Sequence, residues 1–269
     1  MHIGKLAPLI GGEVTDIDLR RPVDVATRRQ LNEAAVEHIA LVIRGQSFTA
    51  EQYLAAASLF GAPMEQHTAP FALPDQPLVH EVSSLAKNSA GQPLMFGGRW
   101  HTDHSDHDIP PKYTMLYAIK LPDKGGGTSF VSMRASYQTL SADCKQRIAD
   151  LRTVTQAFGA TRRDDGTVFP PPAVHPLVRT NPENGAKALY FHPNKTDHIV
   201  GMTPTDSQAL LDELMAHTLR PEFIYTHQWK MGDMLIWDNR AVMHKANFDF
   251  DPAQNRLLYR VMIAGERPR

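Results

Sequence analysis

Two short stretches of the chain combine a histidine with a carboxylate at a spacing that suits a metal ion. They are His101-Thr-Asp103 and His104-Ser-Asp106. Residues i and i+2 of an extended strand share a face, so either pair can direct an imidazole and a carboxylate at one ion. With 13 histidines and 29 acidic residues in 269 positions, about one such pair is expected by chance. Positions 101 and 104 differ by three, so the two pairs would point to opposite faces of a continuous strand. We therefore expect only one of them to line a given cavity.

A third ligand must come from elsewhere in the chain, and the best candidate is His244 in the stretch WDNRAVMH, which begins at residue 237. Two histidines and one carboxylate on one face of an iron leave three positions open, as in non-heme Fe(II) oxygenases. Arg256 and Arg260 follow four residues apart, a spacing that places both side chains on one face of a strand. Paired guanidinium groups suit bidentate binding of carboxylates. The pattern predicts a metal site beside an anion site.

Several motifs of the chain occur in the order and at the separations typical of one enzyme family. They are WHTD at 100–103, GGGT at 125–128 and WDNR…H…R…R from 237 to 260. Further matching stretches are GGEVTDIDLRRP, RGQ at 44–46, HPLVRTNPENGAKALY at 175–190 and IAGERP near the end. Over nearly its whole length the chain thus resembles the TauD/TfdA family of Fe(II)/2-oxoglutarate-dependent dioxygenases.

The resemblance implies a mainly β fold with peripheral helices, a double-stranded β-helix or jelly roll. It also implies that His101, Asp103 and His244 are the iron ligands, and it is the resemblance that selects His101 and Asp103 over the neighbouring pair. Related halogenases have a small residue in place of the carboxylate, so Asp103 indicates a hydroxylase. No catalytic residue beyond the metal centre is expected.

By the same resemblance, Thr128 and Arg256 are expected to hold the distal carboxylate of 2-oxoglutarate. Arg260 is expected to lie near the C1 carboxylate of 2-oxoglutarate and an anionic group of the substrate. His67 lies near the place where the taurine enzyme of this family has a substrate-contacting histidine, and it is a second candidate for substrate binding.

The implied reaction uses Fe(II), 2-oxoglutarate and O2 to hydroxylate a small, anionic organic molecule, a sulfonate or a carboxylate, and releases succinate and CO2. Where the hydroxylated carbon carries a sulfonate or an ether oxygen, the product collapses with cleavage of the C–S or C–O bond. Two other classes stay open. One is a cupin-like hydrolase or isomerase that uses the same ligands with another metal, and the other is a non-catalytic metal-binding jelly roll.

The elements that must position these residues follow from the apolar periodicity and the capping residues. Helices are expected from Asp24 to about His38, from the capping box at Thr49 through residue 60, from 141 to 151 and from 203 to about 219. Strands are expected at 41–44, 78–82, 113–121, 174–179, 188–192, 223–229, 234–237 and 257–263, with an edge hairpin within 10–19.

Composition indicates which partners, cellular location and domain organisation to expect. The net charge of −1 gives no overall field for nucleic acid or an anionic membrane, and no apolar run approaches the ~20 residues that span a bilayer. A single cysteine, Cys144, excludes an internal disulfide and fits a reducing compartment. We expect one cytoplasmic domain over residues 1–269, with an active-site lid within 63–99. The family resemblance adds the expectation of a homodimer or homotetramer.

Overall fold

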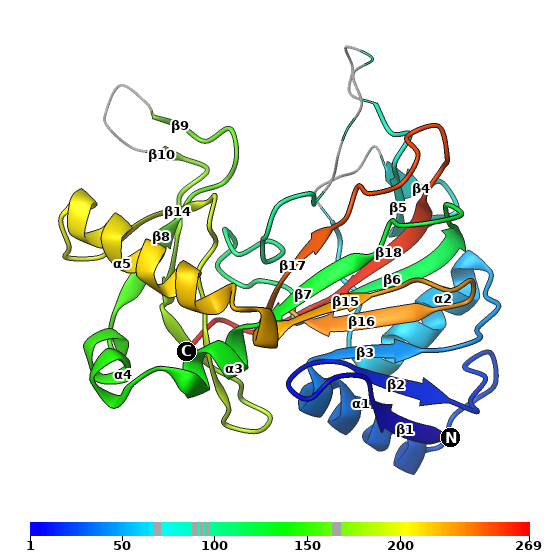
Figure 1. The fold of residues 1–269 in the computed structure, drawn as a ribbon. Coiled ribbons are helices and arrows are strands. Elements are labelled where there is room, and N and C mark those ends of the chain that lie inside the picture. The colour runs from blue at the N-terminus through cyan, green and yellow to red at the C-terminus, as the bar shows by residue number, and fades with distance from the viewer. Residues whose placement is uncertain (67–70, 88–90, 92–93, 95–96, 163–167) are drawn as a thin grey trace.

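An eight-stranded sheet forms the framework of the molecule (Figure 1). The computed structural model describes residues 1–66, 71–87, 91, 94, 97–162 and 168–269. In order across the sheet, the strands are β1 (His2–Lys5), β2 (Gly12–Thr15), β3 (Ala40–Ile43), β16 (Met234–Asp238), β6 (Tyr113–Lys120), β18 (Leu257–Ile263), β5 (Gln76–Ser83) and β4 (Ala72–Leu73). Neighbouring strands are antiparallel except for β2 and β3, which run parallel.

A smaller sheet of three antiparallel strands lies beside the larger one and completes the jelly roll. Its strands are β15 (Ile224–His227), β7 (Thr128–Ser132) and β17 (Val242–Ala246). Leu116, Leu235 and Leu258 of the large sheet share one core with Phe130 and Met243 of the small sheet. Because side chains alternate along a strand, residues of the same parity as Leu258 on β18, including Arg260, are directed to this side of the large sheet.

Two helices cover the opposite face of the large sheet. They are α1 (Val25–His38) and α2 (Ala50–Ala57), which a 3-10 turn at Ser58–Phe60 extends. Asp24 caps α1, and Thr49 with Gln52 forms the expected capping box of α2. The second core, between these helices and the sheet, contains Leu31, Tyr53, Met115, Ile236 and Val261. The large sheet is therefore buried on both faces, which holds the strands that carry the site.

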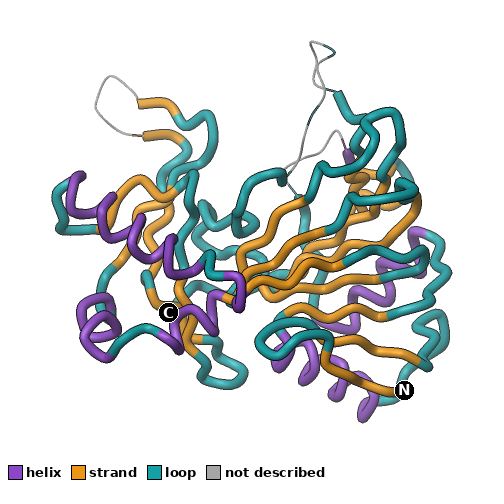
Figure 2. The backbone as a smooth tube through the Cα atoms, in the orientation of Figure 1, coloured by secondary structure: helices purple, strands orange, loops and turns teal. Residues whose placement is uncertain are grey.

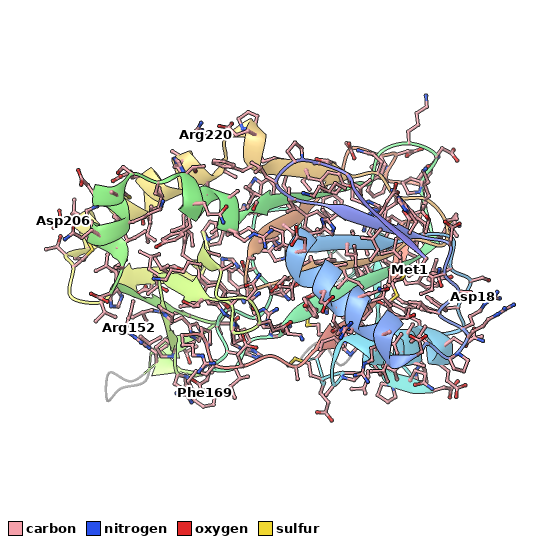
Figure 3. All side chains as sticks on the ribbon, turned by 90° about the horizontal axis from the view of Figure 1, so that it is seen from below. Met1, Asp18, Arg152, Phe169, Asp206 and Arg220 are labelled. Atoms are coloured by element: carbon pink, nitrogen blue, oxygen red, sulfur yellow. The ribbon has the colours of Figure 1, made fainter. Side chains whose placement is uncertain are left out.

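The remaining elements lie at the other end of the molecule, beyond the small sheet (Figures 1 and 2). The helices are α3 (Met133–Thr139), α4 (Ala142–Ile148) and α5 (Pro204–Thr218), with a 3-10 turn at Pro221–Phe223. The strands are β8 (Arg152–Thr155), β9 (Thr161–Arg162), β10 (Val168–Phe169), β11 (Ala173–Pro176), β12 (Val178–Thr180), β13 (Lys187–Leu189) and β14 (Thr196–Ile199). Figure 3 shows Met1 and Asp18 at one end of the molecule and Asp206 and Arg152 at the other.

Several expected elements are present with small differences in their limits, and three expectations need correction. The edge hairpin pairs β2 with β1, which begins at His2, rather than lying within 10–19. The strand expected at 174–179 is two strands separated by Leu177. The sequence did not predict α3, β7 or β17, and the last two carry Thr128 and His244.

The segment 63–99, expected to form a lid, contributes β4 and β5 to the large sheet. Parts of this segment lie outside the described residues, so an active-site cover there stays a prediction. Within the described part of the chain, no helix combines the length and the apolar character that crossing a membrane requires.

Candidate metal centre and cosubstrate site

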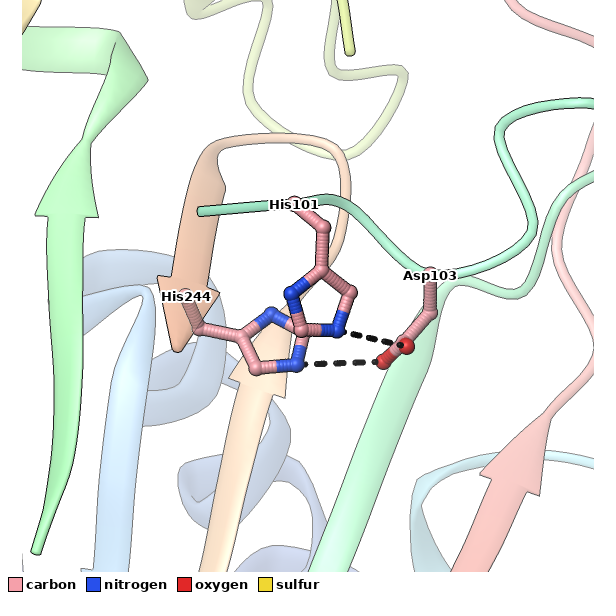
Figure 4. Close-up of side chains that lie close together, drawn as sticks. All are labelled: His101, Asp103 and His244. Atoms are coloured by element: carbon pink, nitrogen blue, oxygen red, sulfur yellow. Dashed lines mark ion pairs between the residues drawn. The ribbon is translucent and has the colours of Figure 1, made fainter. Parts of the chain in front are cut away.

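His101 and His244 come from segments more than 140 residues apart and are joined through their main chains. The amide of His101 donates to the carbonyl of His244 at 3.0 Å, and the amide of His244 donates back to the carbonyl of His101 at 2.9 Å. This isolated β-bridge places the two imidazole rings beside each other, with their centroids 4.1 Å apart. Asp103 faces both rings (Figure 4).

The three expected ligands converge on one point. The Nε2 atom of His101 lies 3.6 Å from Oδ1 of Asp103, and the Nε2 atom of His244 lies 3.6 Å from Oδ2 of the same carboxylate. All three side chains offer ligand atoms within 4.8 Å of one another. Metal–ligand bonds of about 2.1 Å place neighbouring ligand atoms roughly 3 Å apart, so a divalent ion fits between these atoms after a small inward movement. The donor set and its geometry match a two-histidine, one-carboxylate site.

Hydrogen bonds outside this cluster fix the orientation of His101. Its Nδ1 atom lies 2.7 Å from the carbonyl oxygen of Arg99, which can only accept. The Nδ1 atom therefore carries the proton, and the lone pair of Nε2 is directed at the cluster, as a metal ligand requires.

A chain of hydrogen bonds orients Asp103. Thr114 of β6 donates from Oγ1 to Oδ2 of Asp103 at 2.7 Å. Asn239 donates to the same Thr114 oxygen at 2.9 Å and accepts from Nε1 of Trp237 at 3.1 Å. Thr114 was not predicted from the sequence, because a threonine inside a strand carries no distinguishing pattern. Asn239 lies within the WDNR motif, which is the feature that identifies it.

The protonation states of the cluster suit metal binding. Burial opposes ionisation of Asp103, but the imidazoles of His244 and His101 and the guanidinium of Arg260 outweigh it and hold the pKa of the carboxyl well below its usual range. Burial, reinforced by His101, lowers the pKa of His244 to about 3. Near neutral pH the site thus presents a carboxylate and a neutral imidazole, the forms that bind metals.

The geometry expected for the neighbouring pair, His104 and Asp106, needs correction. Residues 101–104 do not form a continuous strand, because the structure has a single bridge at His101 and His104 adopts a positive φ of 46°. As a result, His104 lines the same cavity as His101 and Asp103. Asp106 binds the ammonium group of Lys195 at 2.8 Å. His104, Asp106 and His107 also offer ligand atoms within 4.8 Å of one another, but Lys195 already supplies a cation to this carboxylate.

A cavity of about 980 Å³ opens beside the three ligands. Positive side chains at its wall include Arg99, Lys195, Lys245 and Arg260, and aromatic ones include Phe158 and Phe248. Arg260 of β18 donates from Nε to Oε1 of Gln66 at 2.6 Å. His67, the other candidate for substrate binding, lies outside the described residues.

Thr128 and Arg256 meet in a buried site next to the GGGT motif. Arg256 donates from Nη2 to Oγ1 of Thr128 at 3.2 Å and from Nε to the carbonyl oxygen of Gly126 at 2.7 Å. Trp229, which was not predicted from the sequence, donates from Nε1 to the same Thr128 oxygen at 3.1 Å. The hydroxyl oxygen of Thr128 thus accepts from two donors, so its own proton is available for an acceptor.

Burial lowers the pKa of Arg256 to about 10, and Asp249 partly opposes this effect. Arg256 is 5% exposed, and it forms no ion pair with a carboxylate among the described residues. A buried cation without a partner of opposite charge is costly. Its surroundings therefore favour an anionic ligand. The expected pair of Thr128 and Arg256 is brought together, although neither residue lines the cavity beside the metal ligands.

Comparison with known proteins gives one consistent result. The sequence profile described as taurine catabolism dioxygenase TauD, TfdA family, matches residues 2–262. An alpha-ketoglutarate-dependent 2,4-dichlorophenoxyacetate dioxygenase from a Burkholderia strain (RASC) is 31% identical, over 98% of this chain and 94% of the relative. The crystal structure of a taurine dioxygenase from Burkholderia xenovorans superposes with a TM-score of 0.84 at 33% identity, over 99% of this chain and 90% of that one. The crystal structure of AAD-2 with Mn(II) and N-oxalylglycine gives 0.83 at 30% identity, over 99% of both chains.

Proposed function

We propose that this chain hydroxylates a small organic anion at a site formed by His101, Asp103 and His244. The premise is that the chain belongs to the TauD/TfdA family of non-heme iron, 2-oxoglutarate-dependent dioxygenases. The observation that carries this proposal is the convergence of these three side chains beside a cavity of about 980 Å³.

The three ligands would hold Fe(II) on one side and leave the other side open to small molecules. When bound there with 2-oxoglutarate and O2, the iron supplies the oxidising power: 2-oxoglutarate becomes succinate and CO2, and one oxygen atom enters a C–H bond of the substrate. The contribution of the protein is to hold Asp103 ionised, to orient His101 through the Arg99 carbonyl, and to align the substrate.

Thr128 and Arg256 are the residues that we assign to the distal carboxylate of 2-oxoglutarate. Trp229 and Arg256 occupy the acceptor positions of the Thr128 hydroxyl, so its proton points to another acceptor. A carboxylate at this place would accept from Thr128 and neutralise the buried guanidinium of Arg256. Arg260 lies at the cavity wall on the large sheet, and we assign it to the C1 carboxylate and to an anionic group of the substrate.

The substrate that we propose is a sulfonate or carboxylate, or a related oxygen-linked anion. Arg99, Lys245 and Arg260 give the cavity wall an excess of positive side chains, and Phe248 adds an apolar surface. The relatives are named for substrates of different size that carry a carboxylate or a sulfonate, 2,4-dichlorophenoxyacetate and taurine. Hydroxylation of a carbon bonded to an ether oxygen or a sulfonate sulfur would break that bond as the product collapses.

The experiment that tests the class is succinate release from 2-oxoglutarate with Fe(II), ascorbate and O2, measured across a set of sulfonates and carboxylates. We expect one or more of these compounds to raise the rate many-fold. Turnover of a substrate without O2 would instead support a cupin-like hydrolase or isomerase. Binding of iron without any release of succinate would support a non-catalytic jelly roll.

The cosubstrate assignment has its own test in Arg256→Gln, which removes the charge and keeps much of the side-chain volume. We expect the concentration of 2-oxoglutarate that gives half-maximal succinate release to rise about 100-fold, because a buried charge-assisted contact is lost. The matched control is Arg147→Gln, in an ion pair with Glu213 at the surface, which we expect to leave this value unchanged. An unchanged value for Arg256→Gln removes this residue from the proposed role.

A further inference from the structure

His227 on β15 is buried next to the cosubstrate site, and the proposed chemistry gives it no role. Its side chain is fully buried, and the residue pairs across the small sheet with Thr128 of β7. Residues directly opposite each other in an antiparallel pair share a face, so the two side chains lie on the same side of the small sheet. His227 is therefore a neighbour of the hydroxyl that we assign to 2-oxoglutarate.

Both ring nitrogens of His227 have partners, which fix the ring and its tautomer. Nε2 lies 3.1 Å from Oδ2 of Asp233, a carboxylate oxygen that can only accept, so Nε2 carries the proton. Burial lowers the pKa of His227, so the ring is neutral near pH 7. Nδ1 then accepts from the hydroxyl of Tyr225 at 3.3 Å. The ring cannot turn without breaking both hydrogen bonds.

Asp233 is itself held by groups from other parts of the chain. Nη1 of Arg44 and the main-chain amide of Lys230 each donate to its Oδ2 atom at 2.8 Å. Arg44 belongs to the RGQ motif at 44–46, to which the proposed function also gives no role. Arg44 follows β3 and Asp233 precedes β16, and these two strands are neighbours in the large sheet. The large sheet thus sets the position of Asp233, and through it that of the His227 ring.

The ring of His227 packs against Trp229, which connects it to the residues that we assign to 2-oxoglutarate. The two ring centroids lie 4.8 Å apart with the planes at 86°, a favourable edge-to-face arrangement. Nε1 of Trp229 donates to Oγ1 of Thr128 at 3.1 Å. The guanidinium of Arg256 lies 5.8 Å from the centre of the same indole ring. His227, which is fixed at both nitrogens, therefore holds the indole that contacts both residues.

The direction of the Trp229 N–H group determines where the proton of Thr128 points. With Trp229 and Arg256 both donating to Oγ1 of Thr128, the hydroxyl must direct its own proton to a third group. An indole that turned away would leave one acceptor position of Oγ1 open, and the proton would no longer be confined to one direction. A carboxylate bound there would then lose a donor that is aimed at it.

We propose that His227 is a positioning residue for the cosubstrate: through Trp229 it directs the Thr128 hydroxyl toward the distal carboxylate of 2-oxoglutarate, with Asp233 holding its ring. This inference rests on the proposed function, because it takes Thr128 and Arg256 as the residues that bind this carboxylate. His227 touches neither 2-oxoglutarate nor the metal in this scheme, and it transfers no proton.

Two 2-oxo acids separate an effect at the distal carboxylate from a general effect on the fold. 2-Oxoglutarate has this carboxylate, whereas 2-oxopentanoate ends in a methyl group in its place. Anaerobic calorimetry with the Mn(II)-loaded protein gives the Kd of 2-oxoglutarate, and displacement of 2-oxoglutarate gives that of 2-oxopentanoate. The ratio of the two Kd values is the selectivity for the carboxylate. We expect His227→Ala to lower it about tenfold, the change expected for one lost hydrogen bond, through weaker binding of 2-oxoglutarate alone.

Other substitutions provide a partial rescue and a control. His227→Phe keeps a ring against Trp229 and is expected to retain part of the selectivity. His175→Ala is the matched control, because His175 is also buried and also makes an edge-to-face contact, with Tyr190 at 5.7 Å between centroids. We expect it to destabilise the fold and to leave the selectivity unchanged. If His227→Ala does not fold, His227→Leu, which fills more of the space without a ring, takes its place with the same expectation.

A double-mutant cycle tests whether His227 acts through the Thr128 hydroxyl. Thr128→Val removes this hydroxyl and keeps the shape of the side chain. We expect His227→Ala to weaken the binding of 2-oxoglutarate in the wild-type background and to have little further effect in the Thr128→Val background. Independent contributions would instead multiply.

Three results would overturn the inference. They are equal weakening of both acids by His227→Ala, a selectivity in this variant equal to that of the wild-type protein, and a full additional effect on top of Thr128→Val. Failure of the proposed function looks different, because the metal-loaded wild-type protein then binds no 2-oxoglutarate in the same titration.

Discussion

A second histidine–carboxylate pair, His104 and Asp106, directly follows His101 and Asp103 in the sequence, and the two pairs have different contacts. His101 and Asp103 face His244, whereas Asp106 is neutralised by Lys195. We expect His101→Ala to lower succinate release by more than about 100-fold, because one of three ligands is lost. His104→Ala is expected to retain much of the activity, since His104 lines the cavity without facing His244. The reverse result would reject the ligand assignment.

Thr114 provides a test of the hydrogen bonds that orient Asp103. Thr114→Val keeps the shape of the side chain and removes the hydroxyl that donates to Asp103 and accepts from Asn239. We expect the affinity for Fe(II) or Mn(II), measured by anaerobic titration, to fall about 10- to 100-fold. Thr153→Val is the matched control, because the hydroxyl of this buried threonine has no partner among the described residues. A metal affinity equal to that of the control would contradict the positioning role of Thr114.

At the scale of secondary-structure elements, the GGGT loop at 125–128 both turns the chain and contacts Arg256. Gly125 and Gly126 both have positive φ values, of 75° and 69°. A Cβ atom on Gly126 would lie 3.1 Å from Cδ of Arg256 and 3.0 Å from Cγ of Pro122. The absence of a side chain therefore lets the loop approach Arg256 closely enough for the Gly126 carbonyl to accept its Nε hydrogen bond.

This close approach predicts a difference between two glycine substitutions. Gly126→Ala and Gly185→Ala both force alanine into left-handed backbone, at a cost of about 1 kcal/mol of folding stability each. Gly185, with a φ of 71°, has open space where its Cβ would be. We expect only Gly126→Ala to raise the KM for 2-oxoglutarate, by about tenfold, because only this Cβ displaces Arg256. Equal KM values in the two variants would show that the contact has no bearing on the cosubstrate.

The sequence predicted strands of mainly apolar residues and capped helices well, and strands with several polar residues poorly. Tyr113–Lys120 and Leu257–Ile263 have enough apolar residues to be recognised, and Asp24 and Thr49 cap the helices that they were expected to cap. The five-residue strands Thr128–Ser132 and Val242–Ala246 were missed, because their stability comes from pairing with each other across the small sheet.

The residues of the site were likewise predicted only in part. The family resemblance supplied His101, Asp103 and His244, which the structure brings together, whereas the spacing of two histidine–carboxylate pairs did not by itself select between them. Thr114 and Trp229 were not predicted, because each makes its contact with a residue distant in the sequence.

At the scale of the whole molecule, buried histidines away from the metal centre make stability depend on pH. His175 and His227 are almost completely buried, and burial lowers the pKa of both. In the unfolded chain they take up protons near pH 6.5, while in the folded protein they do so only at lower pH. The unfolded state binds more protons in this range, so stability falls as the pH falls.

We therefore expect the free energy of unfolding of the metal-free protein to decrease from pH 7.5 to 5.5, as measured by urea denaturation with a chelator present. His175→Gln, whose amide can still donate to the His107 carbonyl that His175 contacts at 2.8 Å, is expected to make this dependence shallower. His198→Gln, at a half-exposed position, is the control and is expected to leave it unchanged. A free energy of unfolding that rises toward pH 5.5 would contradict the argument.

The expected homo-oligomer and the cytoplasmic location stay predictions.

The paired amides and carbonyls of His101 and His244 also bear on how the protein acquires its ion. Where a metal must gather ligands from a loose chain, the entropy lost in ordering them weakens its binding. In this protein the main chains of His101 and His244 are already joined by two hydrogen bonds, so the positions of these two ligands relative to each other are set by the fold. The bridge therefore lowers the entropic cost of bringing these two ligands together around an ion.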